Sequence, residues 1–259
     1  MGFTTLQVAQ DAKIATITLN RPEKRNAVSY ELIDELLAAL EELSASPAQV
    51  VIVTGAGNAF SSGMDLDDLR AITSRLPEEN MQDSATMARM FRAIYEFPRP
   101  TIAAVNGPAI AGGCGIATVC DFTIASRAAR FGYPEVRIGF MPATVSSFLV
   151  RQIGEKRARD LLLTGRIVDA DEAFRLGLAN EIVAPEQLLP RAQELARGLL
   201  ENSPAALRAT KRLLNAYVRS AMDQDLRLAV AENAQIRTTD DFHEGVSSFL
   251  EKRKPSWNA

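Results

Sequence analysis

The sequence predicts an α/β fold that ends in a helical region. Short β-branched runs stop at turn signals, as at residues 13–19 before Asn20-Arg21-Pro22. Runs with helical spacing of apolar residues separate them, and this alternation is typical of a parallel sheet covered on both faces. From residue 201 onward only helical patterns occur, so we expect a core at residues 1–200 and a C-terminal helical region at residues 201–259.

Apolar spacing and turn signals place the individual elements. The predicted strands are 13–19, 50–53, 101–105, 122–125 and 129–131. Two helices are predicted in the first half, at 29–43, with Ser29 as its N-cap, and at 83–97. The helices predicted in the second half are 148–163, 170–176, 186–200, 204–221, 223–237 and 240–253.

Composition removes several classes of function. The chain has 259 residues and a net charge of -3, which argues against a nucleic-acid binder that neutralises phosphates in bulk. Two cysteines, Cys114 and Cys120, and one distant histidine, His243, do not match a zinc site or a disulfide framework, so we expect no metal. His243 is expected on a polar helix surface. The start lacks a basic and apolar leader, and no membrane span is expected, so a cytoplasmic location is predicted.

Two loops are candidates for binding a negatively charged oxygen. Gly112, Gly113 and Gly115 follow a predicted strand and open a helix, but they fit neither a phosphate loop nor the dinucleotide fingerprint. Free N–H groups at a helix start can stabilise an oxyanion. The loop 59–66, which contains Met64, also follows a strand and leads into a helix. The alternative for the glycines is close packing of helix on strand.

Glu135 is the strongest candidate for proton transfer. It lies in Phe-Gly-Tyr-Pro-Glu-Val, among apolar and rigid residues. A carboxyl group in such surroundings has a raised pKa, which suits acid and base work near neutral pH. The alternative is a loop glutamate that pairs with Arg137 or another surface base.

Five segments then form a pattern in order along the chain. They are NRP (20–22) with Asn26-Ala27, AFSSGMDL (59–66), PTIAAVNGPAIAGGCGIATVCD (100–121), FGYPEVRIGFMP (131–142) and FLEKRKPSW (249–257). Together they resemble the enoyl-CoA hydratase/isomerase family, also called the crotonase family. The resemblance implies a β-β-α spiral with a C-terminal helical region that mediates homotrimers or hexamers. It also implies an acyl-CoA substrate and no separate cofactor.

The resemblance assigns roles to residues of this chain. Backbone amides of Met64 and Gly112 would hold the thioester oxygen. The residues that would contact CoA are Lys24, Arg25, Met64, Asp65, Leu66, Asp67, Phe249 and Lys252, the last two sometimes from a neighbouring subunit. The two catalytic glutamate positions of the family's hydratases correspond to Gly115 and Glu135, so this chain keeps one carboxylate of the pair.

This departure leaves three functions open. The first is hydration of a 2-enoyl-CoA with Glu135 as acid and base. Its substrate could be branched or of the glutaconyl type, because residues 136–158 resemble bacterial hydratases of that kind. The second is isomerisation of a 3-enoyl-CoA to a 2-enoyl-CoA by Glu135 alone, and the third is a scaffold that binds acyl-CoA without catalysis. A hydroxyl of Thr144, Ser146 or Ser147 is hypothesised to hold a water in place of the missing glutamate. Residues 67–82 are expected to shape the acyl pocket or its lid.

Overall fold

The computed structural model describes residues 2–257, so residue 1 and residues 258–259 of the two predicted regions lie outside it. The elements of the first half are β1 (Leu6–Asp11), β2 (Ile14–Leu19), η1 (Pro22–Lys24), α1 (Tyr30–Ala45), β3 (Val50–Gly55), α2 (Leu66–Ile72), α3 (Pro77–Tyr95), β4 (Thr101–Val105), β5 (Pro108–Ile110), α4 (Gly112–Val119), β6 (Phe122–Ser126) and β7 (Arg130–Gly132). The remaining elements are η2 (Pro134–Ile138), α5 (Ala143–Ile153), α6 (Glu155–Thr164), β8 (Ile167–Asp169), α7 (Ala170–Leu176), β9 (Glu181–Val183), η3 (Pro185–Gln187), α8 (Leu188–Leu200), α9 (Pro204–Ile236) and α10 (Asp240–Leu250).

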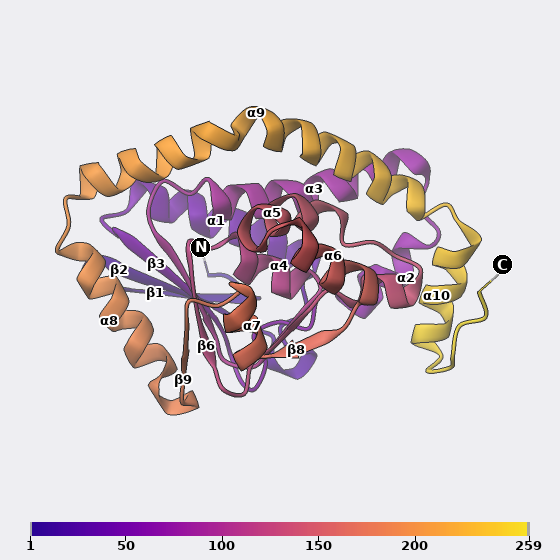
Figure 1. Cartoon of the computed structure of the whole chain (residues 1–259), viewed down its shortest axis with the longest axis horizontal. Helices are drawn as coiled ribbons and strands as arrows, with labels where there is room; N and C mark the ends of the chain where they lie inside the picture. The colour runs from indigo at the N-terminus through magenta and orange to yellow at the C-terminus, as the bar shows by residue number, and fades with distance from the viewer. Residues whose placement is uncertain (1, 258–259) are drawn as a thin grey trace.

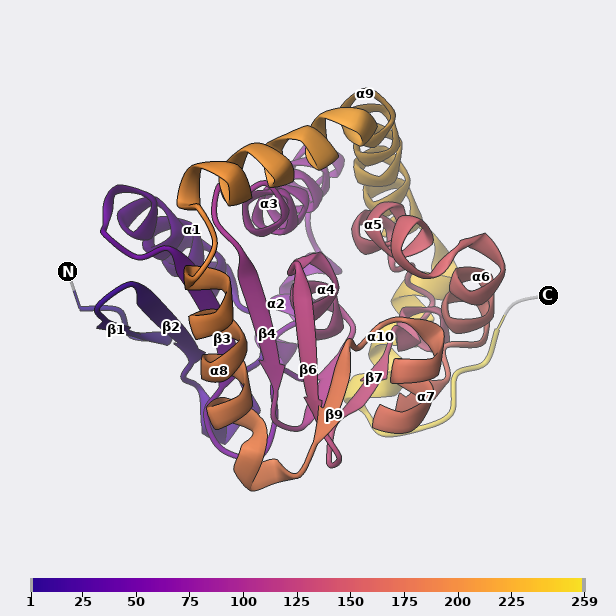
Figure 2. The same ribbon diagram turned by 60° about the vertical axis from the view of Figure 1, so that its left-hand side comes forward.

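The larger sheet has the strand order β1-β2-β3-β4-β6-β9. Strands β2 to β9 in this order pair in parallel, and β1 adds an antiparallel edge. Helix α8 covers one face, where Leu188, Ala192 and Ala196 pack on the sheet (Figure 2). Helices α1, α3 and α4 cover the other face. Residues of β3 and β4 are buried on both sides, which explains their continuous apolar runs, and the predicted sheet with two covered faces is confirmed.

A second, smaller sheet makes the chain a spiral. It contains β5, β7 and β8, and isolated bridges between Ser61 and Ala109 and between Val28 and Met64 extend it. Successive turns of the chain each place a strand in the large sheet, then a short strand in the small one, then a helix, as in β4, β5 and α4. This is the expected β-β-α spiral, and it brings the loop before α2 beside the loop before α4.

Several predicted boundaries are wrong. The helix predicted over 148–163 is two helices, because Gly154, at φ 80°, breaks the chain direction between α5 and α6. The helices predicted at 204–221 and 223–237 are one helix, α9, since nothing near Asp223 interrupts the backbone bonds. Helix α3 starts at Pro77 rather than residue 83, where the Glu79 side chain accepts from the Leu76 amide at 2.8 Å. Strands β1, β5, β8 and β9 were not predicted.

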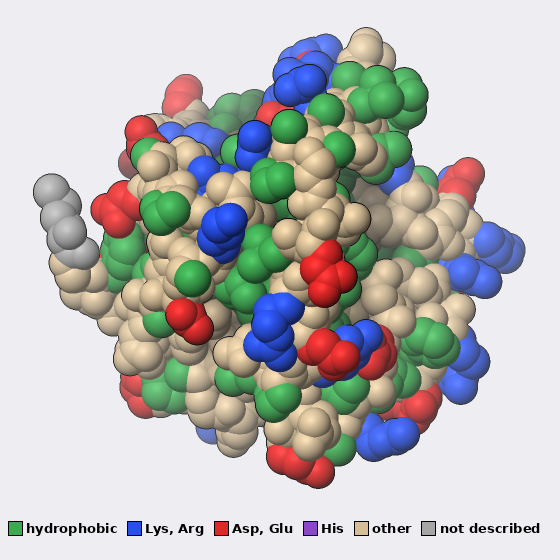
Figure 3. Space-filling view, turned by 90° about the vertical axis from the view of Figure 1, so that its left-hand side faces the viewer, with side chains coloured by type: hydrophobic (Ala, Val, Ile, Leu, Met, Phe, Trp, Pro, Cys, Tyr) green, Lys and Arg blue, Asp and Glu red, His purple; other side chains and the backbone are tan. Residues whose placement is uncertain are grey.

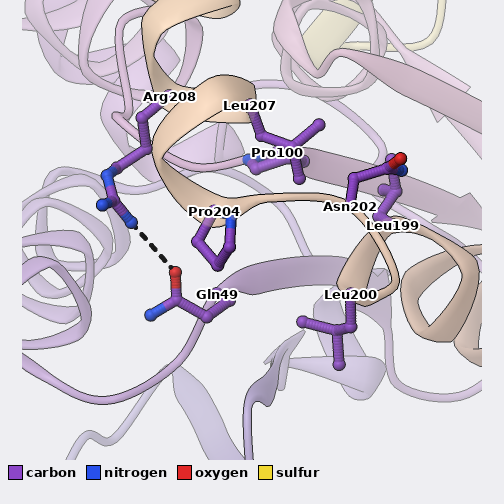
Figure 4. Close-up of a pocket in the computed structure, with 8 residues that line it drawn as sticks. All are labelled: Gln49, Pro100, Leu199, Leu200, Asn202, Pro204, Leu207 and Arg208. Atoms are coloured by element: carbon purple, nitrogen blue, oxygen red, sulfur yellow. Dashed lines mark hydrogen bonds between the residues drawn. The ribbon is translucent and has the colours of Figure 1, made fainter.

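The C-terminal helices pack on the core of their own chain. Helix α9 runs across α3 and α5, and α10 descends beside α2 (Figure 1). Lys211 fastens α9, because its buried ammonium donates to Asp121 at 2.6 Å and to the Arg99 carbonyl at 3.1 Å. At the start of α9, Arg208 donates to Gln49 at 3.1 Å beside a small pocket that none of the predicted site residues lines (Figure 4).

The surface carries both signs of charge. Acidic, basic and apolar side chains are interspersed on the face seen in Figure 3. None of the helices in residues 2–257 is long and apolar enough to cross a membrane.

Candidate active site

The 3-10 helix η2 presents Glu135. Buried Tyr133 precedes it, and Gly139 ends the turn at φ 66° with its amide bonded to the Glu135 carbonyl. The Oε2 atom of Glu135 is buried and has no hydrogen-bond partner within residues 2–257. Arg137 is exposed and does not hold this carboxyl group, so the alternative of a surface ion pair between the two is not what the structure contains.

Burial controls the acidity of Glu135. It raises the pKa of the carboxyl group from 4.5 to about 7, while the backbone amide of Glu135 itself acts in the opposite direction. A group with this pKa exists in both protonation states near neutral pH. It can therefore donate a proton or accept one, as general acid–base catalysis requires.

The backbone amides of Met64 and Gly112 have no partner within residues 2–257. The Val28 amide donates to the Gly63 carbonyl at 2.7 Å, and the Val28 carbonyl accepts from the Asp65 amide at 2.9 Å. In this register the N–H of Met64, which lies between Gly63 and Asp65, makes no bond to Val28. Gly112 is the first residue of α4, where a helix has no carbonyl to offer its amide. Neither N–H has an acceptor among the described residues. Both are therefore available to an outside oxygen.

The loops that carry these two amides touch each other. The Ile110 amide donates to the Ser61 carbonyl at 2.9 Å. A Cβ on Gly63, which has φ 91°, would lie 2.9 Å from the Cβ of Ala111. A Cβ on Gly113 would lie 2.5 Å from the Ser61 oxygen, so the glycines do serve close packing here. The same contact holds the Met64 loop against the start of α4.

Glu135 belongs to the same neighbourhood. The residue before Gly112, Ala111, has an unusual φ of 50°, and its amide donates to the Gly132 carbonyl at 2.8 Å. Burial raises the pKa of the Cys114 thiol to about 12, and the nearby charge of Glu135 adds to this effect. The residues predicted as catalytic, Met64, Gly112 and Glu135, thus come together around the first turn of α4.

Gly115 faces an aromatic ring. A Cβ built on Gly115 would lie 2.5 Å from Cζ and 2.7 Å from Cε1 of Phe91 on α3. The Phe91 side chain is only 2% exposed, so the core confines it. Phe91 takes up the space that a side chain at position 115 would need. The helix predicted at 83–97 contains Phe91, but no pattern in the sequence pairs that residue with Gly115.

The hydroxyl groups of α5 are mostly engaged within their own helix. Ser146 Oγ donates to the Ala143 carbonyl at 2.6 Å, and Ser147 Oγ donates to the Thr144 carbonyl at 3.1 Å. Such bonds are ordinary for serine in a helix. The buried Thr144 hydroxyl makes no such bond. Of the three hydroxyls hypothesised to hold a water, it is the one whose proton is not already committed to α5.

The residues expected near CoA form an ion-pair cluster at the start of α2. Buried Asp65 caps this helix and accepts from Arg21 at 2.6 Å. Lys24 is exposed, and its ammonium lies 3.2 Å from Asp65 and 3.0 Å from Asp67. These carboxylates raise the pKa of Lys24. Arg25 is exposed and has a left-handed backbone at φ 51°.

Two exposed apolar side chains lie on α2 and α10, the helix that packs against it. Leu66 is 51% exposed and Phe249, at the end of α10, is 48% exposed. Lys252 follows in a left-handed turn at φ 58°. Helix α10 packs against η2 and α2, so these tail residues lie on the same side of the molecule as Glu135. His243 on α10 is exposed, as predicted.

The segment 67–82 forms most of α2 and the start of α3. Leu69 and Ile72 pack against Phe242 and Val246 of α10, with Met64 and Phe140 at the edge of the cluster. A polar cluster lies next to it, in which the buried Arg237 donates to Asn233 at 2.8 Å and stacks on Phe140 at 5.4 Å. No group of three His, Cys, Asp or Glu within residues 2–257 could hold a metal ion.

The fold and the site are those of an α/β spiral enzyme. Two backbone amides without internal partners among the described residues lie beside a buried carboxyl group whose pKa is about 7. The chain matches the family model "Enoyl-CoA hydratase/isomerase" over residues 9–259 and belongs to that family. It is 48% identical to "Putative enoyl-CoA hydratase" of Thermus thermophilus, over 93% of this chain and 96% of the relative. It is 34% identical to "Crotonyl-CoA hydratase" of Syntrophomonas wolfei, over 99% of each.

Solved structures agree on the fold. A crystal structure of an enoyl-CoA hydratase/isomerase from Xanthobacter autotrophicus Py2 superimposes with a TM-score of 0.90, at 31% identity and over 100% of both chains. A crystal structure of an enoyl-CoA hydratase from Mycobacterium avium subsp. paratuberculosis K-10 gives a TM-score of 0.88 at 27% identity. The crotonase-like fold predicted from the sequence is confirmed.

Proposed function

We propose that this enzyme adds water to a 2-enoyl-CoA, with Glu135 as its acid and base. The observation that carries the proposal is the buried carboxyl group, with a pKa of about 7, beside two unpartnered amides. The relatives are named hydratases, which supports hydration over isomerisation. A short acyl group is supported by the name of the Syntrophomonas wolfei relative, and the glutaconyl type is the first branched class to test.

The reaction follows from these groups. The thioester oxygen accepts hydrogen bonds from the N–H groups of Met64 and Gly112, which stabilise the enolate. Neutral Glu135 gives its proton to C2. The other carboxyl oxygen takes a proton from the water whose oxygen bonds to C3. Glu135 ends the cycle protonated, as it began, and the double bond is consumed.

Isomerisation is the second candidate, and Gly115 favours it. Residue 115 is glycine and carries no carboxylate, and the ring of Phe91 fills the space beside it, so neither residue offers a polar partner to a water there. Ionised Glu135 can take a proton from C2 of a 3-enoyl-CoA and return it to C4, which moves the double bond to C2–C3. This reaction needs one carboxylate and no water.

The rest of the substrate is proposed to be CoA, with no separate cofactor and no metal. Lys24, Arg25 and Lys252 supply cations for its phosphates, and Leu66 and Phe249 supply apolar contacts. We also propose a homotrimer or a hexamer in the cytoplasm. Exposed apolar residues on α9, among them Leu213, Leu214 and Tyr217, support the assembly.

The test is a paired assay with crotonyl-CoA and 3-hexenoyl-CoA, with wild type beside Glu135→Gln. Loss of the conjugated enoyl absorbance with the first substrate, lowered about 10²–10⁴-fold in the variant, is the expected result. Growth of absorbance with the second substrate alone would replace hydration by isomerisation. Acyl-CoA binding without turnover, unchanged in Glu135→Gln, would make the chain a scaffold and contradict both.

A further inference from the structure

Phe91 and Gly115 meet where α3 crosses α4. In a helix the Cα–Cβ bonds tilt toward the N-terminus, so a side chain on residue 115 would extend over the first turn of α4. That turn begins with the free amide of Gly112. A carboxylate at position 115 would therefore lie on the side of the site where a second proton-transfer group could act. The buried ring of Phe91, 2.5 Å from the place of the first side-chain atom, blocks it.

We propose that Phe91 determines the reaction specificity of this enzyme, because its ring occupies the space beside Gly115 in which a second water-holding group would lie. An ordered water needs two to four polar partners, and an aromatic ring edge supplies none. Glu135 is then the one carboxyl group that exchanges protons with the substrate. The ring lowers the rate of water addition relative to movement of the double bond. This inference rests on the proposed function, since it concerns the balance between its two candidate reactions.

The experiment compares Gly115→Glu, Phe91→Ala and the double variant with wild type. Each protein is assayed for hydration of crotonyl-CoA and for isomerisation of 3-hexenoyl-CoA. Gly115→Glu alone should lose at least about 10-fold in both rates, because its Cβ cannot fit beside the ring. In the double variant the ratio of hydration to isomerisation should rise by about 10²-fold, the usual contribution of one added acid–base group. Phe97→Ala, a buried phenylalanine just after α3, serves as the matched control and should not rescue Gly115→Glu.

Two results would overturn the proposal. One is a Gly115→Glu protein with normal melting temperature and the same ratio as the double variant. The other is a folded double variant that binds acyl-CoA and keeps the wild-type ratio. If the double variant does not fold, the milder pair Gly115→Ala and Phe91→Leu is melted singly and together, and additive shifts would contradict the contact. If the wild-type protein shows no turnover at all, the proposed function is contradicted. The melting comparison of the single and double variants then still tests the contact between Phe91 and Gly115.

Discussion

The pKa of Glu135 makes the two candidate reactions distinguishable by pH. Hydration starts from the neutral carboxyl group, so its kcat/KM should fall as pH rises through about 7. Isomerisation starts from the carboxylate, so its kcat/KM should rise through the same pH. The measurement is a profile of kcat/KM from pH 5 to 9 with each substrate, since this quantity reports groups of the free enzyme. A profile that is flat between pH 6 and 8 would remove Glu135 as the proton-transfer group.

The same residue links pH to stability. The folded pKa of Glu135 is raised above its ordinary 4.5 to about 7, so the folded state holds the proton more tightly than the unfolded one. The resulting penalty is absent below pH 4.5, grows between 4.5 and 7, and is complete above 7. Glu135→Gln should therefore stabilise the protein at pH 8 by at most about 3 kcal/mol. Urea unfolding at pH 8 and pH 5 checks this, and an equal gain at both values would contradict it.

At the scale of elements, the contact between α10 and η2 sets the position of the C-terminal tail relative to Glu135. A Cβ on Gly245 would lie 2.3 Å from the backbone of Ile138, and no flexible side chain stands there to yield. Gly245→Ala should thus cost about 1–3 kcal/mol and lower turnover through displaced η2. Gly198→Ala on α8 is the control, because its Cβ meets nothing within 4 Å and should stabilise by about 0.5–1 kcal/mol. Thermal melting with a crotonyl-CoA assay measures both, and equal melting temperatures would refute the role of this contact.

The elements also show what local sequence can and cannot carry. Three local signals predict the structure well: the apolar runs of β3 and β4, the Ser29 cap of α1 and the glycines that open α4. Strands β8 and β9 are three residues long, so their partners rather than their own residues define them. The position of Glu135, unlike these strands, is a local signal, because it follows from its own motif. The ring beside Gly115 comes from another helix, and no spacing in the sequence reveals that contact.

For the whole molecule, α9 raises the question of assembly. Leu213, Leu214 and Tyr217 follow each other at helical spacing on its outer side, and Tyr217 is 71% exposed. Large apolar side chains grouped on a surface mark contact sites. We expect light scattering to give three or six times the monomer mass. Leu214→Glu with Tyr217→Glu should reduce it to the monomer, because burying unpaired carboxylates in such an interface costs several kcal/mol. Val8→Glu on β1, which adds a charge at another exposed apolar position, should leave the mass unchanged. A monomeric wild-type protein would contradict the proposed assembly. Phe249 and Lys252 could then contact CoA only in the site of their own chain.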